Sequence, residues 1–300
     1  MMKKDKLVEM LYQTEAFKVA PADKPFWYTS GKLGPFYINT HYLYGSGKAA
    51  EDLLAKIDAT KAGIADEAAM QKAMTAMLLE ETMKTYKAND VYRQLIDGLV
   101  AEIRNTVNLD EIDFISGGER RDWFFSIPCA QILKKPHLTL FKEGAAVIGY
   151  GDTMMPVGDD SLGGAVCLHI ADLVTEASSY VRAWIPFIER IGGVMKDTFA
   201  IVDRRQGGGE ILRKMNVQLH TMMAVEESFF LKAFDLKFID EGQLAQLQAY
   251  EKNPDAAMKT FFQEHPDFLE KTLAADPAYG GEKAKKRAEL CVEKGFHLPG

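Results

Sequence analysis

The chain has 300 residues, of which 47% are hydrophobic, and its formal net charge is -7. This length allows a full buried core in one large domain with additions, while the acidic balance argues against a nucleic-acid partner. No run of about 20 apolar residues predicts a membrane span. The three cysteines are far apart and odd in number, which favours reduced thiols over disulfides. We therefore expect a soluble, cytoplasmic protein that binds neither nucleic acid nor membranes.

The first third of the chain predicts a helix, a hairpin and more helices. Apolar residues near helical spacing indicate a helix over 4–17. Two aromatic runs at 25–29 and 35–39 flank the glycine-containing stretch 30–34, which is typical of a hairpin. Residues 48–106 are rich in Ala, Met, Lys and Glu and predict two or three helices.

The middle of the chain alternates between strand and helix patterns, which predicts crossover units and a parallel sheet. We expect about five strands, with helices over 121–134 and 178–191. A glycine-rich stretch at 143–163 predicts a long mobile loop, with room for a short strand at 145–149. The expected strands are 112–116, 136–141, 165–170, 198–203 and 217–220.

The sequence after residue 222 predicts helices without strands. Prolines follow Asn253, His265 and Asp276, and each marks a boundary because the residue before proline avoids helical geometry.

Three polar loops follow predicted strands, and the first is Ser116-Gly-Gly-Glu-Arg-Arg-Asp-Trp123. Gly117 and Gly118 would let backbone amides approach a phosphate, and Arg120 and Arg121 offer forked donors for it. A solvated loop with a charged first helical turn is the equally acceptable alternative.

The second loop follows the apolar run at 165–170 and contains Asp172, Thr175, Ser178 and Ser179. An aspartate there can accept hydrogen bonds from ribose hydroxyls or hold hydrated Mg²⁺, and the hydroxyl groups can donate to a phosphate. The alternative is an ordinary helix cap, since Thr and Ser are good N-cap residues.

The third loop, Val202-Asp-Arg-Arg-Gln-Gly-Gly-Gly-Glu210, places Arg204 and Arg205 beside three glycines. Alone it is equally well a flexible surface turn. All three loops follow strands of one parallel sheet, however, and ligands bind at that edge. Together they predict one site for a phosphorylated, polyhydroxyl ligand.

Three segments resemble the orotate phosphoribosyltransferase branch of the type I phosphoribosyltransferases. Ser30-Gly-Lys-Leu-Gly-Pro-Phe-Tyr-Ile-Asn39 is similar to that family's N-terminal hood segment. Residues 170–179 lie on its ribose-phosphate motif, and Asp203-Arg204 matches its Asp-Arg pair. The resemblance covers about 26–40 and 112–222.

This resemblance implies an α/β fold with a central parallel sheet flanked by helices and an N-terminal hood hairpin. The corresponding domain covers 1–222 with a helical insertion at about 48–106, and a helical C-terminal extension covers 223–300. The implied reaction moves a 5-phosphoribosyl group between phosphoribosyl pyrophosphate and a pyrimidine-type base, as in pyrimidine biosynthesis. The family also implies Mg²⁺ as the cofactor and a homodimer.

The resemblance assigns roles to individual residues. Asp172 would hold ribose and metal, and Lys142 would stabilise the leaving pyrophosphate as the second catalytic residue. The substrate-binding residues would be Lys32, Phe36, Tyr37, Gly117, Gly118, Arg120, Arg121, Thr175, Ser178, Ser179 and Arg204.

The chain departs from the family at several of these positions. Ala171 stands where the family has the first of two acids, and Glu176-Ala177-Ser178 stands where it favours Thr-Gly-Gly. The family's loop lysine would fall near Ala145. A carboxylate at 176 would repel a phosphate unless it turns outward. Two functions therefore stay open: an orotate-type transferase, which we favour, or a catalytically degenerate protein that binds a nucleotide or phosphorylated metabolite in a regulatory role.

Overall fold

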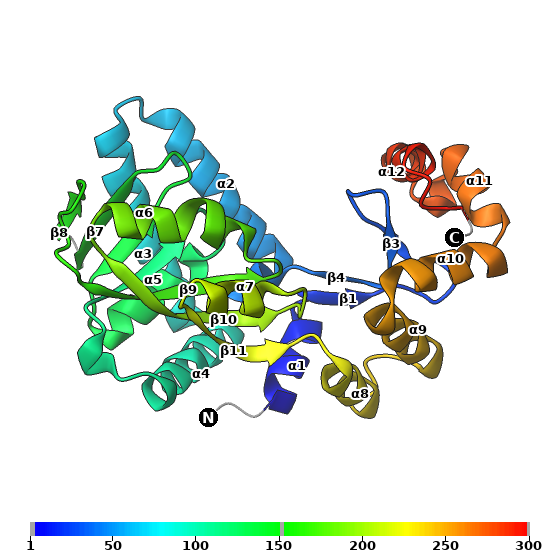
Figure 1. Ribbon diagram of the computed structural model, residues 1–300, viewed down its shortest axis with the longest axis horizontal. Coiled ribbons are helices and arrows are strands. Elements are labelled where there is room, and N and C mark those ends of the chain that lie inside the picture. The colour runs from blue at the N-terminus through cyan, green and yellow to red at the C-terminus, as the bar shows by residue number, and fades with distance from the viewer. Residues whose placement is uncertain (1–3, 151–152, 299–300) are drawn as a thin grey trace. The chain divides into compact units, whose positions relative to one another are not determined.

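The computed structural model describes residues 4–150 and 153–298, and the chain forms two compact units (Figure 1). The first unit contains the residues up to 16 together with 40–225, and the second contains 17–39 together with the chain from 226. The sequence assigned all of 1–222 to one domain, whereas the structure groups 17–39 with the C-terminal helices. The two units are described separately.

The first unit is built on a seven-stranded sheet in the order β11-β10-β9-β5-β6-β7-β8. Neighbours among the first five strands of this order pair in parallel, and β7 and β8 add an antiparallel edge. The predicted α/β fold with a central parallel sheet is confirmed. The strands are β5 (Phe114–Gly118), β6 (His137–Leu140), β7 (Ala146–Tyr150), β8 (Thr153–Pro156), β9 (Val166–Val174), β10 (Val194–Asp203) and β11 (Gln218–Ala224).

The segment 143–163 differs from its predicted loop structure. Its residues 146–150 and 153–156 form β7 and β8, which pair with each other, and β7 also pairs with β6. The run Ala-Val-Ile-Gly-Tyr of β7 supplies the β-branched and aromatic residues that are typical of strands. Among the described glycines of the segment, Gly144 precedes β7 and Gly158 follows β8, and the predicted short strand at 145–149 corresponds to β7.

Helices cover both faces of this sheet (Figure 1). On one face α5 (Trp123–Leu133) packs against β5 and β9, and α3 (Glu67–Ala88) and α4 (Asp90–Thr106) pack on α5. On the other face lie α6 (Ile185–Arg190), which follows a π-helical turn at Tyr180–Trp184, and α7 (Gly208–Lys214). The unit also contains α1 (Lys4–Gln13), the 3-10 helices η1 (Thr40–Tyr44) and η2 (Leu109–Glu111), and α2 (Gly47–Gly63).

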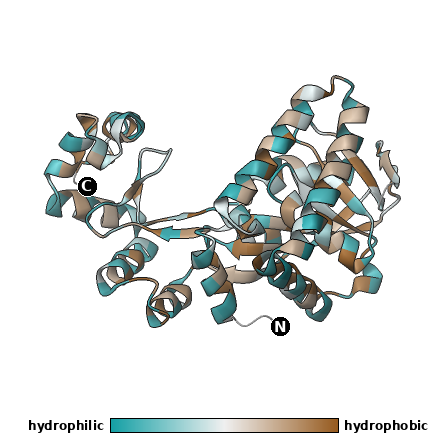
Figure 2. Ribbon diagram, turned by 180° about the vertical axis from the view of Figure 1, so that it is seen from behind, coloured by the Kyte–Doolittle hydropathy of each residue, from teal (hydrophilic) through white to brown (hydrophobic). Residues whose placement is uncertain are grey.

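Hydrophobic residues gather in the strands, as Figure 2 shows, while the outer helices carry both kinds of residue. Trp123, Phe124 and Phe125 of α5 are completely buried on one face of the sheet. Phe114 and Ile188 belong to the core on the other face. Strands covered on both faces read as continuous apolar runs, which is why the sequence located them. Among the described helices, none is long and apolar enough to cross a membrane.

The second unit combines two short strand pairs with five α-helices. β1 (Phe17–Val19) pairs with β4 (Phe36–Ile38), and β2 (Phe26–Trp27) pairs with β3 (Leu33–Gly34). The predicted hairpin between 25–29 and 35–39 is therefore divided: Pro35 has no amide to donate, and the strand after it pairs with 17–19 instead. The helices are α8 (Glu227–Asp235), α9 (Glu241–Lys252), α10 (Pro254–Glu264), α11 (Asp267–Leu273) and α12 (Gly281–Glu293), with the 3-10 turn η4 (Pro277–Tyr279) before the last.

The predicted proline boundaries of this unit are confirmed. Asn253 caps α10, whose first residue is Pro254, and Pro266 precedes α11. Trp27 and Leu33 form one core with residues of α10, α11 and α12, including Phe268. The strands of 17–39 therefore depend on the C-terminal helices for burial.

Candidate functional site

A cavity of about 400 Å³ lies in the first unit, beyond the carboxyl ends of β5 and β9. The chain continues from β5 to β6 on one side and later adds β9 on the other, so this is the switch point at which open α/β sheets bind ligands. A larger cavity of about 720 Å³ in the second unit has mostly apolar walls. The predicted residues that line the first cavity together are Arg120, Arg121, Lys142, Asp172, Thr175, Ser178 and Ser179.

Two of the three cations on this cavity are available to a ligand. Neither Arg121 nor Lys142 makes an ion pair with another residue of the described chain. Arg120 is different, because its guanidinium pairs with Asp58 of α2. An anion entering the cavity therefore meets two uncommitted positive charges and a third that is already neutralised.

The hydroxyl groups of the second loop do not cap a helix. Ser179 occupies the N-cap position of the π-helical turn, but its side chain makes no capping bond. Within residues 4–150 and 153–298, the hydroxyls of Thr175 and Ser178 also have no hydrogen-bond partner. These hydroxyls line the cavity, so the observation favours the ligand-binding interpretation over the helix-cap interpretation.

Glu176 lies outside the cavity wall and its side chain is exposed. The repulsion that a carboxylate would exert on a bound phosphate is therefore weakened by solvent. Ala177 has a φ of 51°, in the left-handed region that glycine adopts without strain. The loop thus keeps a glycine-like backbone shape although the sequence has alanine there.

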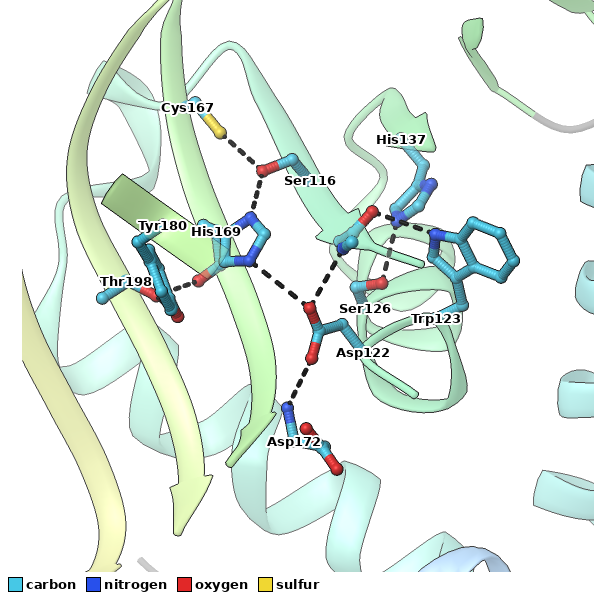
Figure 3. Close-up of polar contacts among 12 residues, drawn as sticks. Ser116, Asp122, Trp123, Ser126, His137, Cys167, His169, Asp172, Tyr180 and Thr198 are labelled. Carbon is cyan, nitrogen blue, oxygen red and sulfur yellow. Dashed lines mark hydrogen bonds and ion pairs between the residues drawn. The ribbon is translucent and has the colours of Figure 1, made fainter. Parts of the chain in front are cut away.

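Two carboxylates lie together at the cavity. Asp122, just before α5, accepts hydrogen bonds from the amides of Asp172 (3.0 Å) and Gly118 (3.1 Å), as Figure 3 shows. Burial, followed by the nearby Asp122 carboxylate, raises the pKa of Asp172 well above its usual range, while Arg121 opposes this shift. The pair therefore favours a ligand that brings hydrogen-bond donors or a cation.

A chain of buried polar groups lies behind the carboxylates (Figure 3). The Nδ1 atom of His169 lies 2.8 Å from the Ser116 hydroxyl, and that hydroxyl lies 2.9 Å from the Cys167 sulfur. The Thr198 hydroxyl donates to the His169 carbonyl and contacts Tyr180. These bonds connect β5, β9 and β10 directly beneath the site and fix the ends of the strands that carry it.

Gly117 and Gly118 have a packing role. A Cβ atom at 117 would lie 2.0 Å from the Ser126 hydroxyl, and one at 118 would lie 2.3 Å from the Trp184 ring. Neither glycine lines the cavity, and the Gly118 amide already donates to Asp122. Their expected phosphate contact stays a prediction.

The third loop supports the second loop from behind. The amides of Arg204 and Gly208 donate to the carbonyls of Val174 and Thr175, both at 2.9 Å. A Cβ atom at Gly208 would lie 2.5 Å from the Thr175 carbonyl, so only glycine fits there. Arg204 is not among the residues lining the cavity, and its role toward a base stays a prediction.

The three residues expected to face a base lie in the second unit and have partners there. Lys32 pairs with Asp255 at 2.6 Å. Phe36 is buried against Phe17, with ring centroids 5.0 Å apart, and the Tyr37 hydroxyl donates to the Trp27 carbonyl. Their contact with a base stays a prediction.

Sequence reasoning missed the acid Asp122 and the contribution of α2. Asp122 belongs to the first loop, but it is 50 residues away from Asp172, and no local pattern indicates that the two carboxylates lie side by side. Lys61 of α2 bridges Glu119 (3.1 Å) and Glu143 (2.5 Å), and the second Glu119 oxygen accepts the Lys142 amide. Helix α2 therefore ties together the two loops that carry Arg121 and Lys142.

The sequence was compared with known families and proteins. No family profile matches the chain. An orotate phosphoribosyltransferase of Thermoplasma volcanium is 34% identical over 58 residues, which are 19% of this chain and about a third (34%) of that relative. An orotate phosphoribosyltransferase of Methanosphaera stadtmanae is 28% identical over 134 residues, or 45% of this chain and 72% of the relative.

A solved structure provides a comparison of fold. The UMP synthase of Leishmania donovani superposes with a TM-score of 0.52 and 14% identity, covering 84% of this chain and 42% of that protein. At this identity the likeness concerns the fold alone. It agrees with the central, mostly parallel sheet described above.

Proposed function

We propose that the chain is a divergent orotate phosphoribosyltransferase, which transfers a 5-phosphoribosyl group between phosphoribosyl pyrophosphate and a pyrimidine-type base; its similarity to two orotate phosphoribosyltransferases supports this. Orotate is the first base to test. In this reaction the bond between ribose C1 and the pyrophosphate oxygen breaks, and a bond between C1 and a ring nitrogen forms.

The observation that carries the proposal is the set of uncommitted groups around the cavity. Arg121 and Lys142 provide positive charge, and Thr175, Ser178 and Ser179 provide hydroxyl donors. Because these groups have no other partner within the described part of the chain, all of them can be directed at an anion whose charge develops in the cavity. A pyrophosphate and a 5-phosphate are the anions that this reaction brings to one site.

The leaving pyrophosphate gains negative charge as its bond to C1 breaks. The sequence has no lysine or arginine between Lys142 and Arg182, so the segment of β7 and β8 supplies no cation. Arg121 and Lys142 therefore carry this stabilisation in our proposal. Asp172 holds the ribose, in agreement with its position at the end of β9.

The carboxylates of the site fit a substrate-bound Mg²⁺. Mg²⁺ is usually held by one or two carboxylates together with substrate phosphates and water. Asp172 and Asp122 offer that number, and the described residues contain no group of three or more potential metal ligands. The ion would neutralise part of the pyrophosphate charge.

The resemblance assigns recognition of the base to Lys32, Phe36, Tyr37 and Arg204, of which the first three lie in the second unit. We keep these roles as proposals. The same holds for a homodimer, which light scattering would detect as twice the chain mass of 33.5 kDa.

The first test is calorimetric titration of the purified protein with phosphoribosyl pyrophosphate and Mg²⁺, then with orotate and with orotidine monophosphate. We expect saturable binding at micromolar concentration, followed by formation of orotidine monophosphate in a turnover assay.

Binding of the nucleotide or sugar phosphate without any turnover would contradict the proposed reaction and favour the degenerate, regulatory protein. No heat with any of the three ligands at millimolar concentration would reject both functions for these ligands.

A further inference from the structure

The carboxylate of Asp122 is held in a fixed orientation at the cavity although it comes from a different element than Asp172. Its Oδ1 accepts the Asp172 amide at 3.0 Å, and its Oδ2 accepts the Gly118 amide at 3.1 Å. A carboxylate has about four acceptor positions, so two remain for other donors. Asp122 lines the cavity, where a ligand can supply them.

A buried histidine faces the same carboxylate. His169 is completely buried, and its Nε2 lies 3.7 Å from Asp122 Oδ2 with no hydrogen-bond partner among the described residues (Figure 3). Its Nδ1 is fixed by the Ser116 hydroxyl. The ring is therefore held against the inner side of Asp122 and supports the carboxylate from the core.

The paired acids contrast with the rest of the cavity wall. Arg121, Lys142 and three hydroxyl-bearing residues suit a phosphate, whereas two adjacent carboxylates repel one. A carboxylate pair is instead satisfied by a group with two neighbouring donors, such as a vicinal diol. One ligand that presents both an anion and a diol is a sugar phosphate.

Ala171 explains why the second acid comes from elsewhere. Its side chain is 2% exposed and belongs to the apolar core of the sheet, so β9 presents only Asp172 as an acid at this place. The loop before α5 brings Asp122 to it. The two carboxylates thus come from β9 and from the loop between β5 and α5, on either side of the switch point.

We propose that Asp122 acts with Asp172 as the carboxylate pair that receives the vicinal hydroxyls of the ribose ring. This inference rests on the proposed function, because it concerns the sugar of the same substrate. Asp122 supplies the second acid that β9 does not supply at position 171, and it makes the site selective for ribose over deoxyribose.

The test compares ribose 5-phosphate with 2-deoxyribose 5-phosphate, which differ in one hydroxyl, by calorimetry alongside phosphoribosyl pyrophosphate. Asp122→Asn keeps the side-chain size, and Asp122→Glu keeps the charge if loss of an acceptor unfolds the first variant. Asp110→Asn, at an exposed position of η2, is the matched control. Thermal melts establish that each variant is folded.

We expect the wild-type protein and D110N to bind ribose 5-phosphate about tenfold more tightly than its deoxy analogue, since hydrogen bonds to charged groups have that strength. In D122N the ratio of the two affinities should fall to within twofold, while binding of the deoxy compound changes little.

Equal weakening of the binding of both compounds in D122N would mean a purely structural role for Asp122 and overturn the inference. An unchanged ratio in D122N would also overturn it, as would a wild-type protein that binds phosphoribosyl pyrophosphate without discriminating. A wild-type protein that does not bind phosphoribosyl pyrophosphate would reject the proposed function itself.

Discussion

The adjacent residues Arg120 and Arg121 both line the cavity, but they differ in their ion-pair partners. Arg120 is paired with Asp58, whereas Arg121 makes no ion pair within the described part of the chain. A charge already neutralised contributes less to a new anion than an uncommitted one. Substituting each arginine in turn therefore compares a paired with an unpaired cation of the same residue type at neighbouring positions.

Arg121→Gln should weaken binding of pyrophosphate by ten- to hundredfold, the usual strength of a hydrogen bond between charged groups. Arg120→Gln should weaken it less than fivefold, because the exposed pair with Asp58 already screens that charge. Titration calorimetry with pyrophosphate and Mg²⁺ measures both. If the two variants lose affinity equally, Arg121 does not have the distinct role that its lack of a partner suggests.

The buried imidazole of His137 should make stability depend on pH. Burial, with a smaller contribution from His169, lowers the pKa of His137 to about 3, and its nitrogens lie 2.8 Å from the Thr139 hydroxyl and 2.9 Å from the Ser126 hydroxyl. The unfolded chain takes up a proton near pH 6.5 and the folded chain does not. Below pH 6.5 the free energy of unfolding should therefore fall, by about 1.4 kcal/mol per pH unit for this group.

Urea unfolding between pH 6 and pH 4.5 measures this slope. His137→Gln should flatten it by about 1.4 kcal/mol per pH unit, whereas His265→Gln, at a partly exposed position, should leave it unchanged. The same slope in wild-type protein and H137Q would show that His137 accepts its proton in the folded state.

At the scale of elements, Lys61 of helix α2 connects two loops of the site, in addition to the pair that Asp58 of the same helix makes with Arg120. Lys61 bridges Glu119 and Glu143, and Glu119 also fixes the backbone of Lys142. The Glu119 side chain is only 7% exposed, so removal of Lys61 leaves a nearly buried carboxylate without its cation. The ion pair between Lys61 and Glu119 should therefore contribute more to stability than a pair between two exposed side chains.

Lys61→Gln should lower the melting temperature by several degrees and weaken pyrophosphate binding severalfold. Lys48→Gln is the control, because Lys48 pairs with Asp52 on the same helix and both are well exposed. Differential scanning calorimetry and titration calorimetry report the two effects. Identical melting temperatures for K61Q and K48Q would argue against a bracing role for α2.

The strands of the parallel sheet could be predicted because burial on both faces leaves apolar runs such as Phe114-Ile115 and Ile170-Ala171. The proline-marked helix boundaries could be predicted because proline acts locally. Pairings between distant segments could not. Nothing local indicates that 36–38 pairs with 17–19, since that choice depends on which partners the tertiary fold makes available.

The candidate site was predictable to the same extent. Its composition identified Arg121, Asp172 and Thr175, because strand ends share one edge of a sheet. Its pairings were not predictable: Asp122 with Asp172, and Arg120 with Asp58, join segments whose proximity exists only in three dimensions. Only the structure therefore shows which charged side chains of the site already have an ion-pair partner within the protein.

At the scale of the whole molecule, each unit is assembled from two separate segments of chain. The strands of 17–39 bury Trp27 and Leu33 against the C-terminal helices. A protein truncated after Val225 should keep the sheet of the first unit but expose this apolar surface. We expect it to be mostly insoluble or to bind the dye ANS strongly, whereas the full chain does neither.

Solubility after expression and ANS fluorescence measure this effect. The matched control is truncation after Val225 with Trp27→Ser and Leu33→Ser, which should restore solubility by removing the exposed apolar side chains. A soluble, ANS-negative protein from the simple truncation would show that 17–39 finds another burial partner.

The division of the second unit between the two ends of the chain has a consequence during synthesis. Roughly 190 residues separate Asn39 from the start of α8 at Glu227. At about 5–20 residues per second, a ribosome needs about 10–40 s to cover that distance. Throughout this time the early segment has left the ribosome while its partners do not yet exist. A translation pause before α8 therefore prolongs the time during which apolar side chains of the early segment, such as Trp27 and Leu33, are exposed on the nascent chain.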